Sequence, residues 1–226
     1  MTQRIPVVVY GDSIMRATVV EQGGKRHFTF SGYAPQLEQA GLEVQNRAKY
    51  GATVDRGQRA LEQDLARGVQ ARYALLCFGG NDCDHNWQEV AAAPQAEHLP
   101  HTALPAFLQT LSGMARRLLA VGIQPVFMTL PPIDAERYLD TIAAGGADRG
   151  RVLQWLGDTQ RIYRFHELYS DGVARLASRL RQPLVDVRAR FLERRDSQQL
   201  IAADGIHLTP DGYDLLFGTL CQAARA

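Results

Sequence analysis

The stretch Val7-Val8-Val9-Tyr10-Gly11-Asp12-Ser13-Ile14 decides the fold of this chain. Its apolar, β-branched first half is typical of a buried parallel strand, and it ends abruptly in a glycine, an acid and a serine. We expect Met15-Arg16-Ala17 to open a helix, which places Ser13 at the carboxyl edge of a sheet and at a helix N-terminus. Open α/β sheets bind ligands at that edge, and a helix N-terminus favours developing negative charge. The stretch therefore predicts a nucleophilic serine.

Short apolar runs along the rest of the chain alternate with longer helical patterns, as in a parallel α/β sheet. The expected strands are residues 5–10, 42–46, 73–78, 124–129 and 183–187. The expected helices are roughly residues 56–66, 105–120 and 159–180, followed by a last helix with Thr209 as N-cap and Pro210 at its first position. With 226 residues the chain is long enough for one such domain, so we expect a single domain over residues 1–226.

Two long connections do not fit this alternation. Residues 83–104 are rich in Ala, Pro and His, and residues 131–158 contain a double proline, two adjacent glycines and scattered aromatic residues. Loops of this length in a compact domain are usually functional or disordered. Because both follow the carboxyl ends of expected strands, we expect them to form cap segments over the site.

Composition excludes several partners. Lys and Arg number 25 against 24 Asp and Glu, so no global field favours a nucleic acid or an anionic membrane. The three cysteines have neither metal-ligand spacing nor a disulfide pattern. The N-terminal residues lack a signal-peptide pattern, and no run approaches the roughly 18 apolar residues of a membrane span. We expect a cytoplasmic protein with a small-molecule partner; its oligomeric state does not follow from the residues.

A base for the serine is found far downstream, in Asp204-Gly205-Ile206-His207. A hydroxyl nucleophile needs a base within hydrogen-bond reach, and that base needs a partner that fixes its tautomer. His207 can serve as the base, and Asp204 is close enough in sequence to reach its Nδ1. Ser13, His207 and Asp204 together favour a serine hydrolase.

Two further loops offer donors for the oxyanion of a tetrahedral intermediate. Gly79-Gly80-Asn81-Asp82 follows the third expected strand, where the Asn81 side chain can donate and the glycines let substrate approach. The loop after the second expected strand offers the backbone N–H of Gly51. Each residue also has a structural alternative: Ser13 as a helix cap, Asn81-Asp82 as a turn, and Gly51 as a residue of positive φ.

Taken together, these blocks resemble the SGNH (GDSL-type) hydrolase superfamily. The first block reads Gly11-Asp12-Ser13-Ile14, with Ile where the family often has Leu; the others are carried by Gly51, Gly79-Gly80-Asn81-Asp82 and Asp204-Gly205-Ile206-His207. The resemblance implies a flavodoxin-like, three-layer α/β/α sandwich of about five parallel strands, without metal or cofactor. It implies Ser13 as nucleophile and an oxyanion hole of the Ser13 and Gly51 N–H groups with the Asn81 side chain. We assign Gly11, Asp12, Gly79 and Asp82 supporting roles.

The substrate is less constrained, because the family covers several kinds of ester. His85, Trp87, Tyr138 and Trp155 fall in the long connections and could stack on or hydrogen-bond to a sugar, or could simply pack the cap onto the body. No long apolar tunnel is evident, so we expect removal of a short acyl group, acetyl first, from a carbohydrate or similar polar alcohol. The alternatives are a lysophospholipase or thioesterase, an O-acyltransferase with the same residues, and a catalytically silent carbohydrate-binding protein.

Overall fold

The structure, a computed structural model, describes residues 4–21 and 25–225. Its centre is a five-stranded parallel sheet with strand order β4-β1-β5-β6-β7. The strands are β1 (Ile5–Gly11), β4 (Leu42–Asn46), β5 (Tyr73–Cys77), β6 (Gln124–Met128) and β7 (Leu184–Val185). Numbered within the sheet alone, this order is 2-1-3-4-5, the flavodoxin-like arrangement. The predicted fold class is confirmed.

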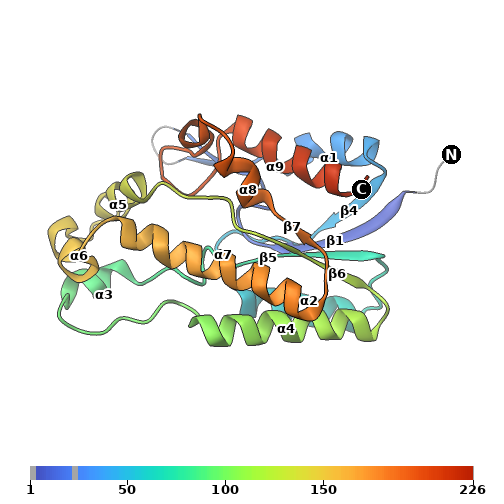
Figure 1. Cartoon of the computed structure of the whole chain (residues 1–226), viewed down its shortest axis with the longest axis horizontal. Helices are drawn as coiled ribbons and strands as arrows, with labels where there is room; N and C mark the ends of the chain where they lie inside the picture. Colours follow the sequence, from blue (N-terminus) through green and yellow to red (C-terminus); the bar gives the residue numbers. More distant parts are fainter. Residues whose placement is uncertain (1–3, 22–24, 226) are drawn as a thin grey trace.

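Helices cover both faces of the sheet and make three layers (Figure 1). One face carries α1 (Phe30–Gln39), α8 (Val187–Leu192) and α9 (Pro210–Ala223); the other carries α2 (Val54–Ala66), α4 (Leu104–Ala120) and α7 (Gln160–Leu180). No helix within residues 4–21 and 25–225 is both long and apolar enough to cross a membrane.

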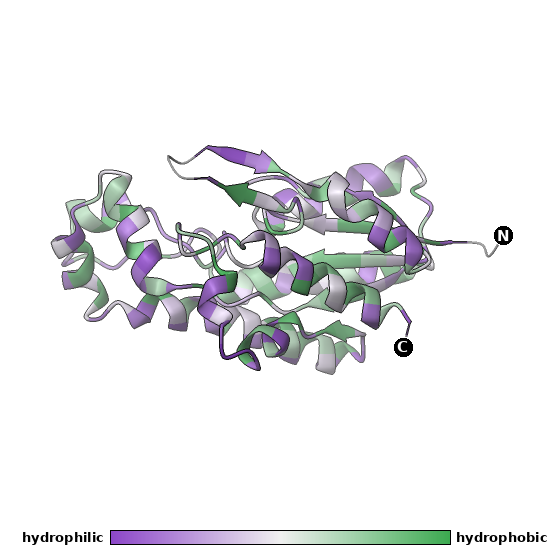
Figure 2. Ribbon diagram, turned by 90° about the horizontal axis from the view of Figure 1, so that it is seen from above, coloured by the Kyte–Doolittle hydropathy of each residue, from purple (hydrophilic) through white to green (hydrophobic). Residues whose placement is uncertain are grey.

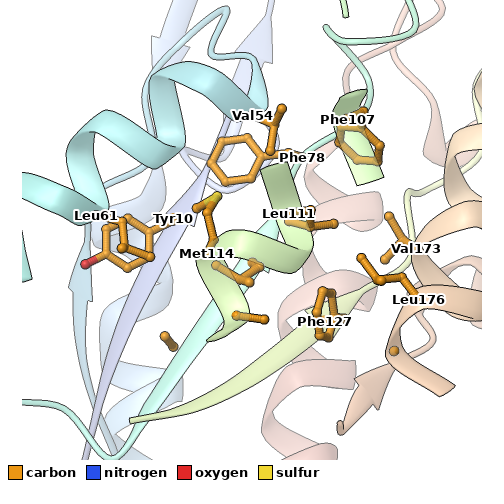
Figure 3. Close-up of a cluster of buried hydrophobic side chains, with 14 of the residues drawn as sticks. Tyr10, Val54, Leu61, Phe78, Phe107, Leu111, Met114, Phe127, Val173 and Leu176 are labelled. Carbon is orange, nitrogen blue, oxygen red and sulfur yellow. The ribbon is translucent and has the colours of Figure 1, made fainter. Parts of the chain in front are cut away.

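The core lies on both faces of β1, which explains its continuous apolar sequence. Val8 and Tyr10 point into the cluster under α2 and α4, whereas Val9 points into the cluster under α9. This alternation follows from the two-residue period of a strand. Figure 2 shows the central strands as largely hydrophobic. Figure 3 shows the first cluster, in which Tyr10 lies near Leu61 and Phe78 near Val54.

The two long connections form helices at the carboxyl end of the sheet. Residues 83–104 contain α3 (Trp87–Ala92), and residues 131–158 contain α5 (Ala135–Ala144) and α6 (Arg149–Leu156). These three helices lie together beyond the strand ends (Figure 1) and share an apolar cluster centred on Val90, Leu139 and Val152. The loops expected from composition therefore contain short helices with a small core of their own.

The helix expected directly after Ser13 was wrong. Residues 13–17 form a turn with one hydrogen bond of the α-helical type, from Arg16 N to Asp12 O at 3.3 Å, and Ala17 then has a φ of +50°. The chain continues into an antiparallel hairpin, β2 (Thr18–Val20) and β3 (Arg26–Phe28). The β-branched run at Thr18–Val20 favours a strand over a helix. Ser13 consequently has no helix dipole behind it.

The expected last strand, residues 183–187, was too long. Only Leu184–Val185 pair with β6, because the Asp186 side chain accepts a hydrogen bond from Ala189 N and caps α8. Helix α1 has no counterpart among the elements predicted from the sequence; its interior Pro35 weakens the helical pattern there.

Candidate active site

Ser13, His207 and Asp204 form a hydrogen-bonded row at the carboxyl edge of the sheet. The Oγ of Ser13 lies 3.0 Å from Nε2 of His207, and Nδ1 of His207 lies 2.6 Å from Oδ2 of Asp204. Ser13 and His207 are buried, His207 almost completely, and Asp204 is partly buried. With the imidazole proton on Nδ1, Nε2 is free to accept the hydroxyl proton of Ser13.

The loop that carries the acid and the base is pinned from two sides. Oδ1 of Asp204 accepts the backbone N–H groups of Ile206 and His207 at 3.1 and 3.0 Å, which orients its other oxygen toward the imidazole. Gly205 has a φ of +81° and packs directly on the start of α5, where a Cβ would lie 2.4 Å from Tyr138 N. The Gly205 carbonyl also accepts a 2.8 Å hydrogen bond from Asp134 N. Only glycine fits this position.

Electrostatics favour an ionised Asp204. Burial acts to raise its pKa, but its hydrogen bonds to His207 and Ile206 and the charge of His207 outweigh that effect, and the pKa lies below its ordinary value. Asp12 shows the opposite balance: burial raises its pKa to about 6 despite a hydrogen bond from Ile14 N. A carboxylate oriented toward an imidazole and kept ionised stabilises the imidazolium formed when the base takes a proton.

Strand register brings the donor loops beside the serine. Gly11 pairs with Cys77, so the loops that follow β1 and β5 begin side by side, at the point where the strand order reverses. Nδ2 of Asn81 donates to Ala52 O at 3.2 Å and to Asp12 Oδ2 at 3.3 Å. Both bonds are long, and Asn81 faces the same cavity as Ser13.

The loop with Gly51 crosses the same edge of the sheet. Its neighbour Tyr50 stacks on the His207 ring at 5.9 Å between centroids, and Ala52 holds the Asn81 amide. Within the described part of the chain, the N–H groups of Ser13 and Gly51 take part in no hydrogen bond. Gly51 itself lies outside the cavity wall.

The residues assigned supporting roles hold these loops together. Asp82 accepts a hydrogen bond from Val54 N at 3.0 Å, which ties the β5 loop to the start of α2. Gly79 has a φ of +135°, and a Cβ on it would lie 2.9 Å from Leu130 Cδ1. A Cβ on Gly11 would lie 3.1 Å from the carbonyl of Cys77. A side chain at Gly79 would therefore displace Leu130, and one at Gly11 would crowd the neighbouring strand.

A cavity of about 80 Å³ opens beside Ser13. Its wall is mostly apolar and comes from the turn after β6, from α7 and from the loop of His207: Leu130, Pro131, Ile133, Ile162, Phe165 and Ile206. Polar groups on the wall include Asp84 and His166. A small pocket of this composition is typical of a binding site for a small organic group.

The structure separates the four residues proposed to bind substrate into two pairs. Trp87 and Tyr138 line the cavity, and both donate to Asp84, at 2.8 and 2.6 Å respectively. His85 and Trp155 do not line it. Their rings meet edge-on at 5.1 Å between centroids, and both lie close to Phe165 of α7, so the packing alternative describes their observed contacts.

Neighbouring aromatic side chains engage both His85 and Asp84. Burial, followed by the charges of His101 and His98, lowers the pKa of His85 to about 4, and its ring is enclosed by Trp87, Trp155 and Phe165. Burial raises the pKa of Asp84, whose two oxygens both accept internal hydrogen bonds. In the described ranges, no three His, Cys, Asp or Glu side chains are grouped as metal ligands would be.

His166 is a cavity residue that was not among the site residues predicted from the sequence. His166 is buried on the cavity wall, and its Nδ1 lies 3.4 Å from Nη1 of the buried Arg188. Burial and then the Arg188 charge lower the pKa of His166 to about 3, so the ring is neutral. The spacing of Ile162, Phe165 and His166 at i, i+3 and i+4 places all three on one face of α7, a signal present in the sequence.

Comparison with known proteins agrees with this site. The model of the GDSL-like lipase/acylhydrolase family matches residues 9–215. A GDSL esterase/lipase of Arabidopsis thaliana is 23% identical over 227 residues, which cover 98% of this chain and 79% of that protein.

Solved structures share the fold. A lipase/acylhydrolase from Enterococcus faecalis superposes with a TM-score of 0.65 at 17% identity, covering 97% of this chain and 94% of its own. A variant of an acetyl-xylooligosaccharide esterase from Geobacillus stearothermophilus superposes with a TM-score of 0.64 at 19% identity, covering 99% of this chain and 96% of its own. With the family model matched over nearly its whole length, the chain belongs to the GDSL-like lipase/acylhydrolase family and is a hydrolase of ester bonds.

Proposed function

We propose that this protein removes a short acyl group, acetyl first, from a carbohydrate or other polar alcohol through an acyl-Ser13 intermediate. The observation that carries the proposal is the row Asp204–His207–Ser13, which ends at a cavity of about 80 Å³. The acetyl-xylooligosaccharide esterase among the structural neighbours adds support for an acetyl ester.

The first half of the reaction forms the acyl enzyme. His207 Nε2 takes the hydroxyl proton of Ser13 as Oγ attacks the ester carbonyl, and Asp204 stabilises the imidazolium. The negative charge on the carbonyl oxygen is stabilised by the N–H groups of Ser13 and Gly51 and by the Asn81 amide, which gives up one of its long bonds. The ester C–O bond then breaks, and the His207 proton passes to the departing alcohol oxygen.

The second half releases the acid. A water molecule takes the place of the alcohol, His207 removes its proton, and the resulting hydroxyl attacks the acyl carbon. The bond to Oγ breaks, and His207 returns the proton to Ser13. A free carboxylic acid leaves, and the site is restored.

Cavity size sets the expected acyl length. One enclosed water needs roughly 10–15 Å³ on this scale, so about 80 Å³ holds a small acyl group and excludes an extended fatty chain. Leu130, Ile162 and Phe165 supply the apolar contacts that a methyl or ethyl group favours.

Two measurements test the proposal. Intact mass after brief treatment with a fluorophosphonate should show one label on the wild type and none on Ser13→Ala, because only an activated hydroxyl reacts. In a series of p-nitrophenyl esters, kcat/KM should fall from acetate to octanoate. Labelling that persists in Ser13→Ala refutes the nucleophile, and faster cleavage of octanoate refutes the short acyl group.

A further inference from the structure

A second, larger recess is lined by the first residues of the loop that follows β4, the loop that also carries Gly51. It is an open groove of about 790 Å³ between the β2–β3 hairpin, the carboxyl end of β4 and α2. Four cationic side chains line it: Arg16, Arg47, Lys49 and Arg67. The single carboxylate on its wall, Asp64, forms an ion pair with Arg47 at 2.8 Å.

This concentration of positive charge contrasts with the balanced composition of the whole chain. Among the described residues, Arg16 and Lys49 take part in no ion pair, and the same holds for Arg26 on the hairpin. Arg16 instead lies 3.8 Å over the ring of Phe28, which is 49% exposed. The groove thus presents cations that the protein itself leaves unneutralised, and these attract an anion.

A row of rings joins the groove to the catalytic histidine. Tyr50 stacks on His207 with 14° between the ring planes, and Phe28 meets Tyr50 edge-on at 6.3 Å. The guanidinium of Arg26 lies 5.0 Å over Tyr50, and that of Arg16 lies over Phe28. A guanidinium group held over an aromatic ring keeps N–H donors at its edge, and these donors bind a carboxylate or phosphate group.

Backbone hydrogen bonds join two of these cationic residues to the serine loop. Arg16 N donates to Asp12 O, and Lys49 N donates to Gly11 O at 3.0 Å, so both backbones are bonded to residues one or two positions from Ser13. The side chains that carry the two charges therefore begin close to the nucleophile.

The reaction places the alcohol part of the ester on this side. His207 must reach the departing oxygen to protonate it, so the alcohol leaves beside the His207 ring, on which Tyr50 stacks. We propose that the Tyr50–Phe28 row and the cations Arg16, Arg26 and Lys49 form a leaving-group subsite for a sugar that carries an anionic group. This inference rests on the proposed function, and it narrows the polar alcohol to an acidic carbohydrate.

The test compares acetyl esters that differ in one anionic group. The substrates are mono-O-acetylated methyl glucoside, methyl glucuronide and methyl glucoside 6-phosphate, and the readout is the ratio of kcat/KM for each anionic ester to that for the neutral one. For the wild type in low salt we expect a ratio of about ten or more, falling toward one in about 0.5 M NaCl because salt screens exposed charges. The carboxylate and phosphate arms show which anion the groove prefers.

Variants test whether the preference for anionic esters depends on the cations of the groove. Each exposed charge contact changes a binding constant by about 1.5- to fivefold, so Arg16→Gln/Lys49→Gln should lower the ratio about fivefold or more. Lys49→Gln alone, at an exposed position, should lower it about twofold. Arg175→Gln removes a charge from the exposed side of α7 and should leave the ratio at the wild-type value.

Two results overturn the inference: a wild-type ratio near one, or a wild-type ratio retained in Arg16→Gln/Lys49→Gln. Because the ratio compares two substrates on the same enzyme, partial loss of folded protein does not change it. Failure of the proposed function gives a different result, since either none of the acetyl esters would be hydrolysed or their hydrolysis would survive Ser13→Ala.

Discussion

Replacing Asp204 by asparagine tests how the acid acts on the base. Oδ1 of Asp204 accepts two backbone N–H groups, so an asparagine side chain in its place keeps its oxygen there and turns its NH₂ group toward Nδ1 of His207. The imidazole must then accept at Nδ1 and carry its proton on Nε2. In that tautomer Nε2 cannot take the Ser13 proton.

Rotating the introduced amide by 180° does not restore the active tautomer at low cost. It would place an NH₂ group against the N–H groups of Ile206 and His207, and each buried donor without an acceptor costs about 1–3 kcal/mol. His207 is almost fully buried, so water does not readily replace the lost partner. We expect kcat/KM to fall about 10³- to 10⁴-fold, equivalent to about 4–5.5 kcal/mol of barrier.

The assay is p-nitrophenyl acetate hydrolysis at about pH 7.5, with the melting temperature as a check on folding. Asp171→Asn, an isosteric change at a surface ion pair of α7, is the matched control and should retain wild-type kcat/KM. A loss of less than about tenfold in folded Asp204→Asn would refute the tautomer argument.

Three further changes give distinct results. Burial raises the pKa of Asp12 from 3.8 to about 6, so the native state binds this proton more tightly than the unfolded chain does. The protonated carboxyl therefore adds to the free energy of unfolding. This contribution is complete below about pH 4 and is lost as the pH rises through 6. Asp12→Asn should therefore gain up to about 3 kcal/mol relative to the wild type between about pH 4 and 7.5 in urea unfolding, and a pH-independent difference would contradict this. Gly205→Ala should lower the melting temperature and kcat/KM together, because the Cβ would overlap Tyr138 N; unchanged activity would show that the loop can shift. Phe165→Ala should raise kcat/KM for butyrate relative to acetate about tenfold by enlarging the cavity, and an unchanged ratio would place the acyl group elsewhere.

The short loops at strand ends could be located from the sequence because their functional residues lie within a few positions of one another. Gly11-Asp12-Ser13 and Asp204-Gly205-Ile206-His207 each combine residues whose spacing already restricts the backbone, and the apolar β1 run indicates a strand buried on both faces. The structure then places Ser13 3.0 Å from His207. The error after Ser13 came from treating one turn as a helix, although β-branched residues follow directly.

Contacts across the fold could not be predicted in this way. The cavity depends on how far α7 approaches the strand ends, and that distance is set by packing of α3, α5 and α6 on Phe165 and its neighbours. Trp87 of α3 and Tyr138 of α5 both donate to Asp84, a contact between separate elements that the sequence does not indicate.

The sequence by itself determined the order of the chemical groups along the chain: a serine after the first strand, an amide after the third, and an acid and a base before the last helix. The positions of these groups depend on residues that are close in sequence, so a linear pattern is enough to predict them. Tertiary structure alone decided which side chains face the cavity and which cations gather in the groove beside Tyr50. Those contacts join residues far apart in the chain, and their distances follow from how the helices pack on the sheet.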